Sequence, residues 1–253
     1  MTVGVSLAID SATDRLTVAL AAHDTVASLH VDGPRRHARE ALGLVDTLLA
    51  EHGLSPRQVT RVISGDGPGS FTGLRVASAI AKALVWGRQD IEWWTAPSLL
   101  ARALAAQQQV MQRPEPIGGA DMTVLAISDA LRGELYAGCW QFRGDTVSQR
   151  GNAPHAMPPA ELAGFGAVDV VVGSIPDALV SAVADATGVQ PVVGDAALPD
   201  ARWLIGLSGW RGGLQQVHDA AAWAPQYGRP AEAQAVWEAK HGRRLPDSTH
   251  HAG

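Results

Sequence analysis

The chain has a single cysteine, Cys139, among its 253 residues, and it has no long uncharged apolar run. One cysteine excludes the internal disulfide framework that small domains of oxidising compartments commonly use. A membrane-spanning helix needs about 20 predominantly apolar residues. The apolar N-terminal stretch already ends at Asp10, and no basic leader precedes it. The sequence therefore predicts a cytoplasmic protein without a membrane span.

The chain also has fewer basic than acidic residues. The chain carries 20 Lys and Arg residues against 25 Asp and Glu residues, a formal net charge of -5, and its isoelectric point is near 6.0. Proteins that bind nucleic acid alone usually carry a clustered basic surface that releases the counterions of the phosphates. We therefore expect any contact with RNA to depend on partners. The hydrophobic content of 46% supports a packed core of one large or two small domains.

Several motifs of catalysis are missing from the chain. No Gly-x-Ser-x-Gly elbow marks a nucleophilic serine, and no glycine-rich loop ends in the Gly-Lys-Ser/Thr of a P-loop. Two metal-binding histidines on one helical face need a four-residue spacing, and no two of the nine histidines have it. This holds for His241 and for the adjacent pair His250 and His251 near the C-terminus. The sequence predicts no metal site and names no catalytic residue.

Hydrophobic periodicity predicts an alternation of strands and helices in the first half of the chain. The predicted strands lie at 3–10, 15–22, 25–31, 61–65 and 91–95. The predicted helices lie at 38–52, 72–86 and 99–109. An order of three strands followed by alternating helices and strands favours an α/β fold with a mixed sheet.

The second half repeats this pattern in shortened form. A stretch at 107–122 is rich in Gln, Pro and Gly and indicates a linker. Shorter strand patterns follow at 122–128, 134–142 and 168–173. We expect an N-terminal lobe at 1–108, a smaller C-terminal lobe at 120–223, and a peripheral tail at 224–253 with one helix at 231–241.

The strongest local signal is a strand that ends at Gly65 and runs through a glycine-rich turn into a helix. The segment reads Gly67-Pro68-Gly69-Ser70-Phe71-Thr72-Gly73-Leu74-Arg75. Glycines let a backbone turn sharply or approach another group closely, and a helix N-terminus presents unpaired amides that attract anions. The segment is either a tight strand-to-helix connection, with Ser70 or Thr72 as the helix cap, or an anion site. Spacing alone favours the connection.

This segment resembles the signature of the TsaB (YeaZ) family. Three further stretches are similar to motifs of that family, in the same order, namely Asp10-Ser11-Ala12-Thr13-Asp14, Asp129-Ala130-Leu131-Arg132-Gly133-Glu134-Leu135-Tyr136 and Pro225-Gln226-Tyr227-Gly228-Arg229. Four ordered matches from residue 10 to residue 229 make chance a poor explanation. The chain departs from the pattern at Ala12, Leu131 and Gly228, where the family has Ser, Arg and Leu. These departures weaken an inference of nucleotide binding and of a conventional C-terminal contact.

The resemblance implies an actin-like ATPase (ASKHA, ribonuclease H-like) fold, in which two related lobes have mixed sheets flanked by helices. It also implies a non-catalytic assembly subunit for the formation of threonylcarbamoyladenosine on tRNA. Such a subunit pairs with a TsaD-like catalytic subunit, acts with a TsaE-like ATPase, and meets tRNA through the complex; a homodimer stays open. No cofactor is required. The rival hypothesis is a small ATP-dependent phosphotransferase of the same superfold.

The resemblance also directs attention to the first two helices of the N-terminal lobe, through which the family pairs its subunits. Gly73, Ala77 and Ala81 recur at every fourth position and form a stripe of small side chains. Such a stripe permits close helix packing, either inside the chain or between subunits. The predicted partner interface comprises Gly67, Pro68, Gly69, Ser70, Phe71, Thr72, Gly73, Arg75, Ala77 and Ala81.

Asp10 and Ser11 are the candidate nucleotide-binding residues. Actin-like ATPases place a carboxylate at the end of the first strand to organise a magnesium-bound phosphate through water, so ATP with magnesium is conceivable at a degenerate cleft. The alternative is that Asp10 only caps the hairpin turn with Ser11. Ala12 favours this alternative, because it removes a potential phosphate donor.

The cluster of Arg35, Arg36 and Arg39 either contacts tRNA phosphate or forms a solvated face.

Overall fold

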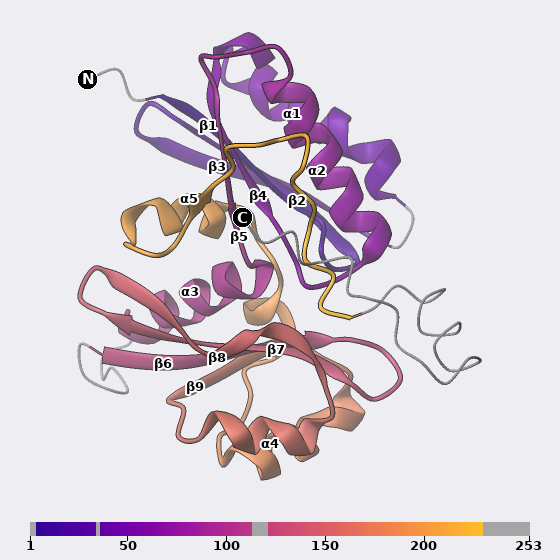
Figure 1. Ribbon diagram of the computed structural model, residues 1–253, viewed down its shortest axis with the longest axis vertical. Coiled ribbons are helices and arrows are strands. Elements are labelled where there is room, and N and C mark those ends of the chain that lie inside the picture. Colours follow the sequence, from indigo (N-terminus) through magenta and orange to yellow (C-terminus); the bar gives the residue numbers. More distant parts are fainter. Residues whose placement is uncertain (1–3, 34–35, 113–120, 230–253) are drawn as a thin grey trace.

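The computed structural model describes residues 4–33, 36–112 and 121–229. Two mixed β-sheets lie one above the other, with helices between them and on their outer faces (Figure 1). The elements are β1 (Val5–Asp10), β2 (Arg15–Ala22), β3 (Thr25–Asp32), α1 (His37–Glu51), η1 (Pro56–Gln58), β4 (Val59–Gly65), α2 (Phe71–Val85), β5 (Glu92–Ala96), α3 (Ser98–Met111), β6 (Asp121–Asp129), β7 (Leu135–Arg143), β8 (Thr146–Met157), η2 (Pro159–Phe165), β9 (Val170–Ser174), α4 (Asp177–Thr187), η3 (Gly194–Ala197), α5 (Arg202–Gly206), η4 (Leu207–Gly209) and β10 (Gln215–Gln216). Arg35, the predicted helix at 231–241 and all histidines from His241 onward lie outside the described residues.

The N-terminal sheet has the strand order β10-β5-β4-β1-β2-β3. Strand β2 runs antiparallel to β1 and β3, whereas β4 and β5 run parallel to β1. The predicted strands and helices of the first half are confirmed to within a few residues. The order of the first five strands is the ribonuclease H-like order that the resemblance implied.

The C-terminal sheet repeats this topology with fewer strands. Its order is β8-β7-β6-β9, in which β7 is antiparallel to its neighbours and β9 is parallel to β6. Strands β6 to β9 thus correspond in order and direction to β1 to β4. The predicted fold class is confirmed: the chain is an α/β protein of two related lobes with mixed sheets flanked by helices.

Strand alternation distributes the apolar side chains over three buried clusters. In β1, Leu7 and Ile9 pack toward α1 and α2, whereas Ala8 faces a second cluster that α3 and α5 fill between the two sheets. In β6, Val124 joins that middle cluster and Leu125 joins a third, beneath the lower sheet, together with residues of α4. The molecule therefore stacks five layers, in the order helices, sheet, helices, sheet, helices.

The second half differs from the sequence prediction in several parts, and none of its helices, α4 included, was predicted. Strand β8 was not predicted, because its segment contains Pro154 and leads into further prolines; a sheet tolerates proline at an edge, and β8 is the edge strand. Helix α5 and strand β10 belong to the expected C-terminal lobe by number, but they pack on the N-terminal sheet. Elements of five and two residues leave no periodic signal in the sequence.

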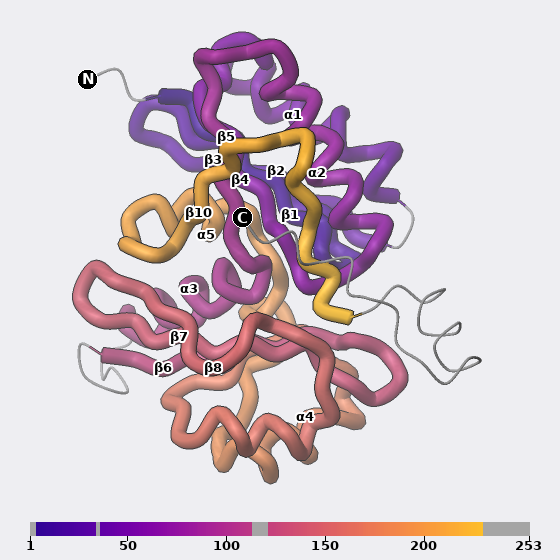
Figure 2. Tube along the Cα trace, viewed as in Figure 1, coloured from indigo at the N-terminus to yellow at the C-terminus, as the bar shows by residue number. Residues whose placement is uncertain are grey.

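The last described segment, coloured yellow in Figure 2, continues from β10 along the edge of the N-terminal sheet and past α2 to the junction of the lobes. We call residues 217–229 the strap. The strap contacts both lobes, since the Gln226 amide donates to the Asp66 carbonyl and the Ala156 amide donates to the Gly228 carbonyl. Within the described part of the chain, no helix has the length and apolar character to cross a membrane.

Candidate functional site

A cleft of about 1270 Å³ lies between the lobes, and residues from both lobes line it. Its walls come from the β1–β2 turn, the start of α2, the β6–β7 turn, the β9–α4 turn and the strap. Each of the four stretches that carry the family resemblance contributes to this lining, through Thr13, Ser70, Arg132 and Tyr227 among others. Segments more than 200 positions apart in the sequence thus meet around one cleft, which makes it the candidate functional site.

The glycine-rich turn before α2 packs directly on the β1–β2 turn. The Ser11 hydroxyl donates to the Gly73 carbonyl at 2.6 Å, and the Ser70 amide donates to the Ala12 carbonyl at 2.7 Å. A Cβ atom at Gly69 or Gly73 would overlap the carbonyl oxygen of Ala12 or Ser11, so close backbone approach requires both glycines. Ser70 caps the helix by accepting from the Gly73 amide at 3.2 Å. Two of the amides at the start of the helix, those of Ser70 and Gly73, are therefore bonded within the chain.

Asp10 lies beneath this contact and does not line the cleft. Its side chain is 4% exposed, and its Oδ1 accepts from the Ala12 amide at 2.9 Å and from the Ser98 hydroxyl at 3.1 Å. Burial raises the pKa of this carboxyl, although both hydrogen bonds and the charge of Arg102 oppose the shift. Asp10 thus makes the turn-capping contact with the Ala12 amide, and neither Asp10 nor Ser11 lines the cleft.

Two further charged side chains are buried near Asp10, and the sequence did not single them out. Arg102 on α3 donates to the Ile127 carbonyl at 2.7 Å, and burial lowers its pKa to about 10. Asp66 follows β4, and burial together with the charge of Asp10 raises its pKa to about 7. Ser98 and Arg102 lie on α3, the helix that follows β5. No local sequence pattern links them to Asp10, so their part in this cluster could not be predicted.

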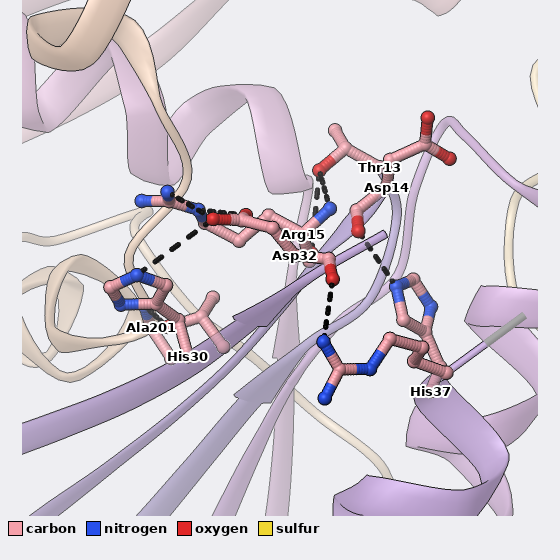
Figure 3. Close-up of polar contacts among 9 residues, drawn as sticks. Thr13, Asp14, Arg15, His30, Asp32, His37 and Ala201 are labelled. Carbon is pink, nitrogen blue, oxygen red and sulfur yellow. Dashed lines mark hydrogen bonds and ion pairs between the residues drawn. The ribbon is translucent and has the colours of Figure 1, made fainter. Parts of the chain in front are cut away.

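The charged residues at one rim of the cleft are paired with one another (Figure 3). Arg15 forms two hydrogen bonds with the carboxylate of Asp32, at 2.7 and 2.8 Å, and this contact lowers the pKa of Asp32. The His37 ring lies 3.2 Å from the Asp14 carbonyl oxygen and ties the start of α1 to the same turn. Arg36 reaches the Asp32 carbonyl at 3.3 Å. These contacts fix the rim and engage Arg15 with a protein carboxylate.

The opposite mouth of the cleft carries a stack of aromatic and arginine side chains. The rings of Phe71 and Tyr227 are 4.2 Å apart, and the Arg75 guanidinium lies 4.0 Å from the centre of the Phe71 ring. The stack joins the first turn of α2 to the strap. Gly228 has a positive φ of 70°, and a Cβ atom there would crowd Pro68 and Tyr136. The departure from the family's Leu at this position therefore suits a close approach that only glycine allows here.

The predicted small-residue stripe on α2 points inward. Ala77 and Ala81 are 0% exposed and belong to the core that α1 and α2 share with the sheet, and Gly73 is buried against the β1–β2 turn. Gly67 and Pro68 are also buried, and a Cβ atom at Gly67 would overlap the Gln226 carbonyl. The prediction that these residues face a partner subunit is corrected: their small size serves packing within the chain. Of the predicted set, the exposed members are Ser70, Phe71, Thr72 and Arg75.

The outward face of the same two helices is apolar in places. Leu42 on α1 is 60% exposed, and Trp86, directly after α2, is 84% exposed. On α2, Ala79 and Ala83 are exposed at a four-residue spacing, which puts them on one side of the helix. Large exposed apolar side chains beside small ones are typical of a surface that another protein covers. We call this set (Leu42, Ala79, Ala83 and Trp86) the outer helix face.

Comparison with known proteins places these features in a family. The family model described as TsaD, tRNA N6-adenosine threonylcarbamoyltransferase, matches residues 32–166, which is more than half of the chain. The protein from Bacillus subtilis named tRNA threonylcarbamoyladenosine biosynthesis protein TsaB is 27% identical over 91% of this chain and 96% of its own length. The chain belongs to this family, as a TsaB-type (YeaZ-type) member. The resemblance carried by the four motifs is thereby confirmed.

Two further relatives support the assignment. The Haemophilus influenzae protein of the same name is 35% identical over 130 residues, about half of each chain (51%). The structure of YeaZ from Pseudomonas aeruginosa is 27% identical and superposes with a TM-score of 0.66, covering 88% of this chain and 99% of its own. The likeness to the B. subtilis and P. aeruginosa proteins extends over both lobes and not only over the motif region.

Proposed function

We propose that the chain acts in tRNA threonylcarbamoyladenosine biosynthesis as a non-catalytic assembly subunit. In this proposal it pairs with a TsaD-like catalytic subunit, works with a TsaE-like ATPase, and meets tRNA through the complex rather than by itself. The names of its relatives support the pathway. The observation that carries the assembly role is the outer helix face, where Leu42 and Trp86 present apolar surface to solvent.

The pairing surface in this proposal is the outward side of α1 and α2. The proposal keeps the helix pair that the sequence predicted and moves the docking surface to the other side of α2, since Ala77 and Ala81 are in the core. Ala79 and Ala83 provide the same small-residue spacing on the accessible side, which lets a partner helix approach closely. A homodimer would cover the same surface when the partner is absent.

The bonding of Asp10 and Ser11 and the burial of Cys139 support a role in which none of these side chains acts as a catalytic group. Asp10 is bonded to the Ala12 amide and to Ser98, and Ser11 to Gly73, so neither side chain is placed to act on a ligand. Among the residues of the described ranges, no group of three or more His, Cys, Asp or Glu side chains could hold a metal ion. Cys139 is buried, and burial raises the pKa of its thiol to about 11, which disfavours the nucleophilic thiolate.

The proposed function is tested in the native host. Depletion of the chain should lower the threonylcarbamoyladenosine content of tRNA, measured by mass spectrometry of digested nucleosides. Wild type should restore this content and Leu42→Glu should not, because a charge on the outer helix face would have to be desolvated on pairing. Val26→Glu is the matched control: Val26 is 54% exposed on β3 and lies on the opposite face of the strand from Ala27 and Leu29, which pack toward the helices. An unchanged content after depletion would overturn the proposed pathway.

The rival phosphotransferase hypothesis predicts a different result for the purified chain. An actin-like kinase should consume ATP in the presence of magnesium and an acceptor, with constants in the micromolar to millimolar range common among enzymes. Our proposal expects no ATP consumption by the chain alone. Turnover that disappears in Asp10→Asn would favour the rival.

A further inference from the structure

A second, smaller cavity lies under the strap, beside Asp66. Its volume is about 210 Å³, which leaves room for several waters or for one small organic ion. Strands β5 and β10 and the strap form its walls. The lining residues are Asp66, Thr95, Gln215, Gln216, Val217, Trp223, Ala224 and Gln226.

Asp66 is the unusual member of this lining. Its side chain is 6% exposed, and its Oδ1 has no hydrogen-bond partner among the described residues. The main chain of the same residue is fully engaged, because its amide donates to the Ala96 carbonyl at 3.0 Å and its carbonyl accepts from the Gln226 amide at 2.7 Å. The backbone therefore holds the Asp66 carboxyl beside the cavity, where Oδ1 is closed to solvent and has no partner, and the residue's own amide is the one hydrogen-bond donor that acts to lower the pKa of the group. A buried polar group in this state lowers stability unless a ligand or ion satisfies it.

No cation of the described chain compensates this carboxyl. Asp66 is the one charged side chain in the lining, and the charge that acts on it is that of Asp10, which is of the same sign. Arg102 on α3 is engaged with the Ile127 carbonyl and influences Asp10. Lys82 on α2 donates to the Trp223 carbonyl at 2.9 Å, on the strap. Of the other charged groups near the cavity, His218 and Asp219 on the strap are exposed to solvent.

We propose that this cavity binds the ammonium group of a small aliphatic amine, with Asp66 as its counterion. An ammonium has three donors and no acceptor, and the cavity offers the carboxylate, the hydroxyl of Thr95 and the side-chain amides of glutamines as acceptors. The indole of Trp223, which stacks on Trp93 at 4.6 Å, adds an aromatic wall that favours a cation.

Other ligand classes fit the cavity less well. A calcium or magnesium ion is usually held by several carboxylate or carbonyl oxygens in a fixed geometry, and this lining has a single carboxylate. A phosphate or carboxylate ligand would meet the charge of Asp66 with no positive side chain in the lining to offset it. A neutral ligand would leave the carboxylate uncompensated. Of these classes, the amine matches both the charge and the acceptors.

The experiment is a calorimetric titration of the full chain with 1,4-diaminobutane at pH 8, at constant ionic strength set with NaCl. We expect saturable binding with one amine per chain. Asp66→Asn removes the charge with almost no change of shape and should weaken binding at least tenfold. Asp24→Asn, a change at an exposed carboxylate in the β2–β3 turn, should leave it unchanged. The uncharged analogue 1,4-butanediol should not bind.

The pH dependence in the wild type provides a second test that needs no variant. Because the carboxyl must be ionised to bind an ammonium and its pKa is raised to about 7, affinity should fall about tenfold from pH 8 to pH 6. Equal affinity of wild type and Asp66→Asn, or the absence of saturable binding at pH 8, would overturn the proposal. If Asp66→Asn does not fold, a wild-type affinity that is the same at both pH values overturns it instead.

Discussion

Replacement of Asp66 by Asn should stabilise the protein, and by an amount that depends on pH. Asp66 is buried, its Oδ1 is without a partner in the described chain, and its neighbour Asp10 carries the same charge. An ionised carboxylate in such surroundings destabilises the folded state, whereas a protonated one costs much less. Asn resembles the protonated form in shape and charge. The variant therefore removes the cost of ionisation and retains the packing.

The magnitude follows from the pKa of Asp66. Its pKa is raised from 3.8 to about 7, a shift of about 3 units, and each unit corresponds to about 1.4 kcal/mol. Since the folded pKa lies above the unfolded one, the stability linked to this group is fully present below pH 3.8 and is lost as the pH rises through 7. At pH 8 the ionised carboxylate should cost roughly 4 kcal/mol, and Asp66→Asn should regain most of it.

Urea unfolding of wild type and Asp66→Asn between pH 5 and pH 8 measures this difference. The difference in the free energy of unfolding should grow by about 1.4 kcal/mol per pH unit up to pH 7 and level off above it. Comparing the two proteins at each pH cancels the other titrating groups, apart from Asp10, which interacts directly with Asp66. Two parallel curves would refute the assignment of a raised pKa to Asp66, and so would a variant that is less stable at pH 8.

Four substitutions on the two helices test the packing directly. Ala77→Glu should cost several kcal/mol and collapse the thermal melting temperature, because it buries an unpaired charge at a position with 0% exposure, whereas Ala79→Glu should leave the melting temperature nearly unchanged. Wild-type melting of Ala77→Glu would contradict the inward orientation of that residue. Gly73→Ala should lower the free energy of urea unfolding by about 1–3 kcal/mol, because its Cβ would overlap the Ser11 carbonyl. Gly43→Ala on α1, with nothing near its Cβ, should raise it by about 0.5–1 kcal/mol, and a similar gain for Gly73→Ala would contradict the close contact.

The strands and helices of the first half were predictable because each one buries a regular apolar face. Leu7 and Ile9 alternate with Ala8 in β1, and Ala41, Val45 and Leu48 recur along α1 at helical spacing. The same logic fails for β8, where edge position tolerates Pro154, and for β10, which has two residues. These two strands form because they pair with β7 and β5, and not because of a local hydrophobic pattern.

The orientation of α2 shows why the interface residues could not be assigned from sequence. Ala77 and Ala81 have the same four-residue spacing as Ala79 and Ala83, so either pair could form the stripe that faces outward. The docking of Gly73 on Ser11 decides the rotation of the helix and sends the first pair into the core. The glycine-rich turn itself was predicted correctly as a capped strand-to-helix connection. Ser70 accepts from the amide of Gly73, only three residues away, and such a local contact can be predicted from sequence.

The buried polar cluster depends on contacts between residues far apart in the chain. Asp10 is held by Ser98, 88 positions away, and Arg102 reaches Ile127 across the two lobes. Asp66 meets the strap through Gln226. No spacing rule connects such residues, so the sequence could nominate Asp10 as a carboxylate at a strand end but could not show that it is sealed from the cleft.

The central claim is that α1 and α2 present their outer helix face to a TsaD-like catalytic subunit. The most direct measurement is the dissociation constant between the purified chain and the TsaD-like subunit of the same organism, determined for wild type, Leu42→Glu and Val26→Glu. The account predicts that Leu42→Glu weakens the affinity at least a hundredfold while folding normally, and that Val26→Glu binds as wild type does. Equal affinities for all three proteins would contradict the claim.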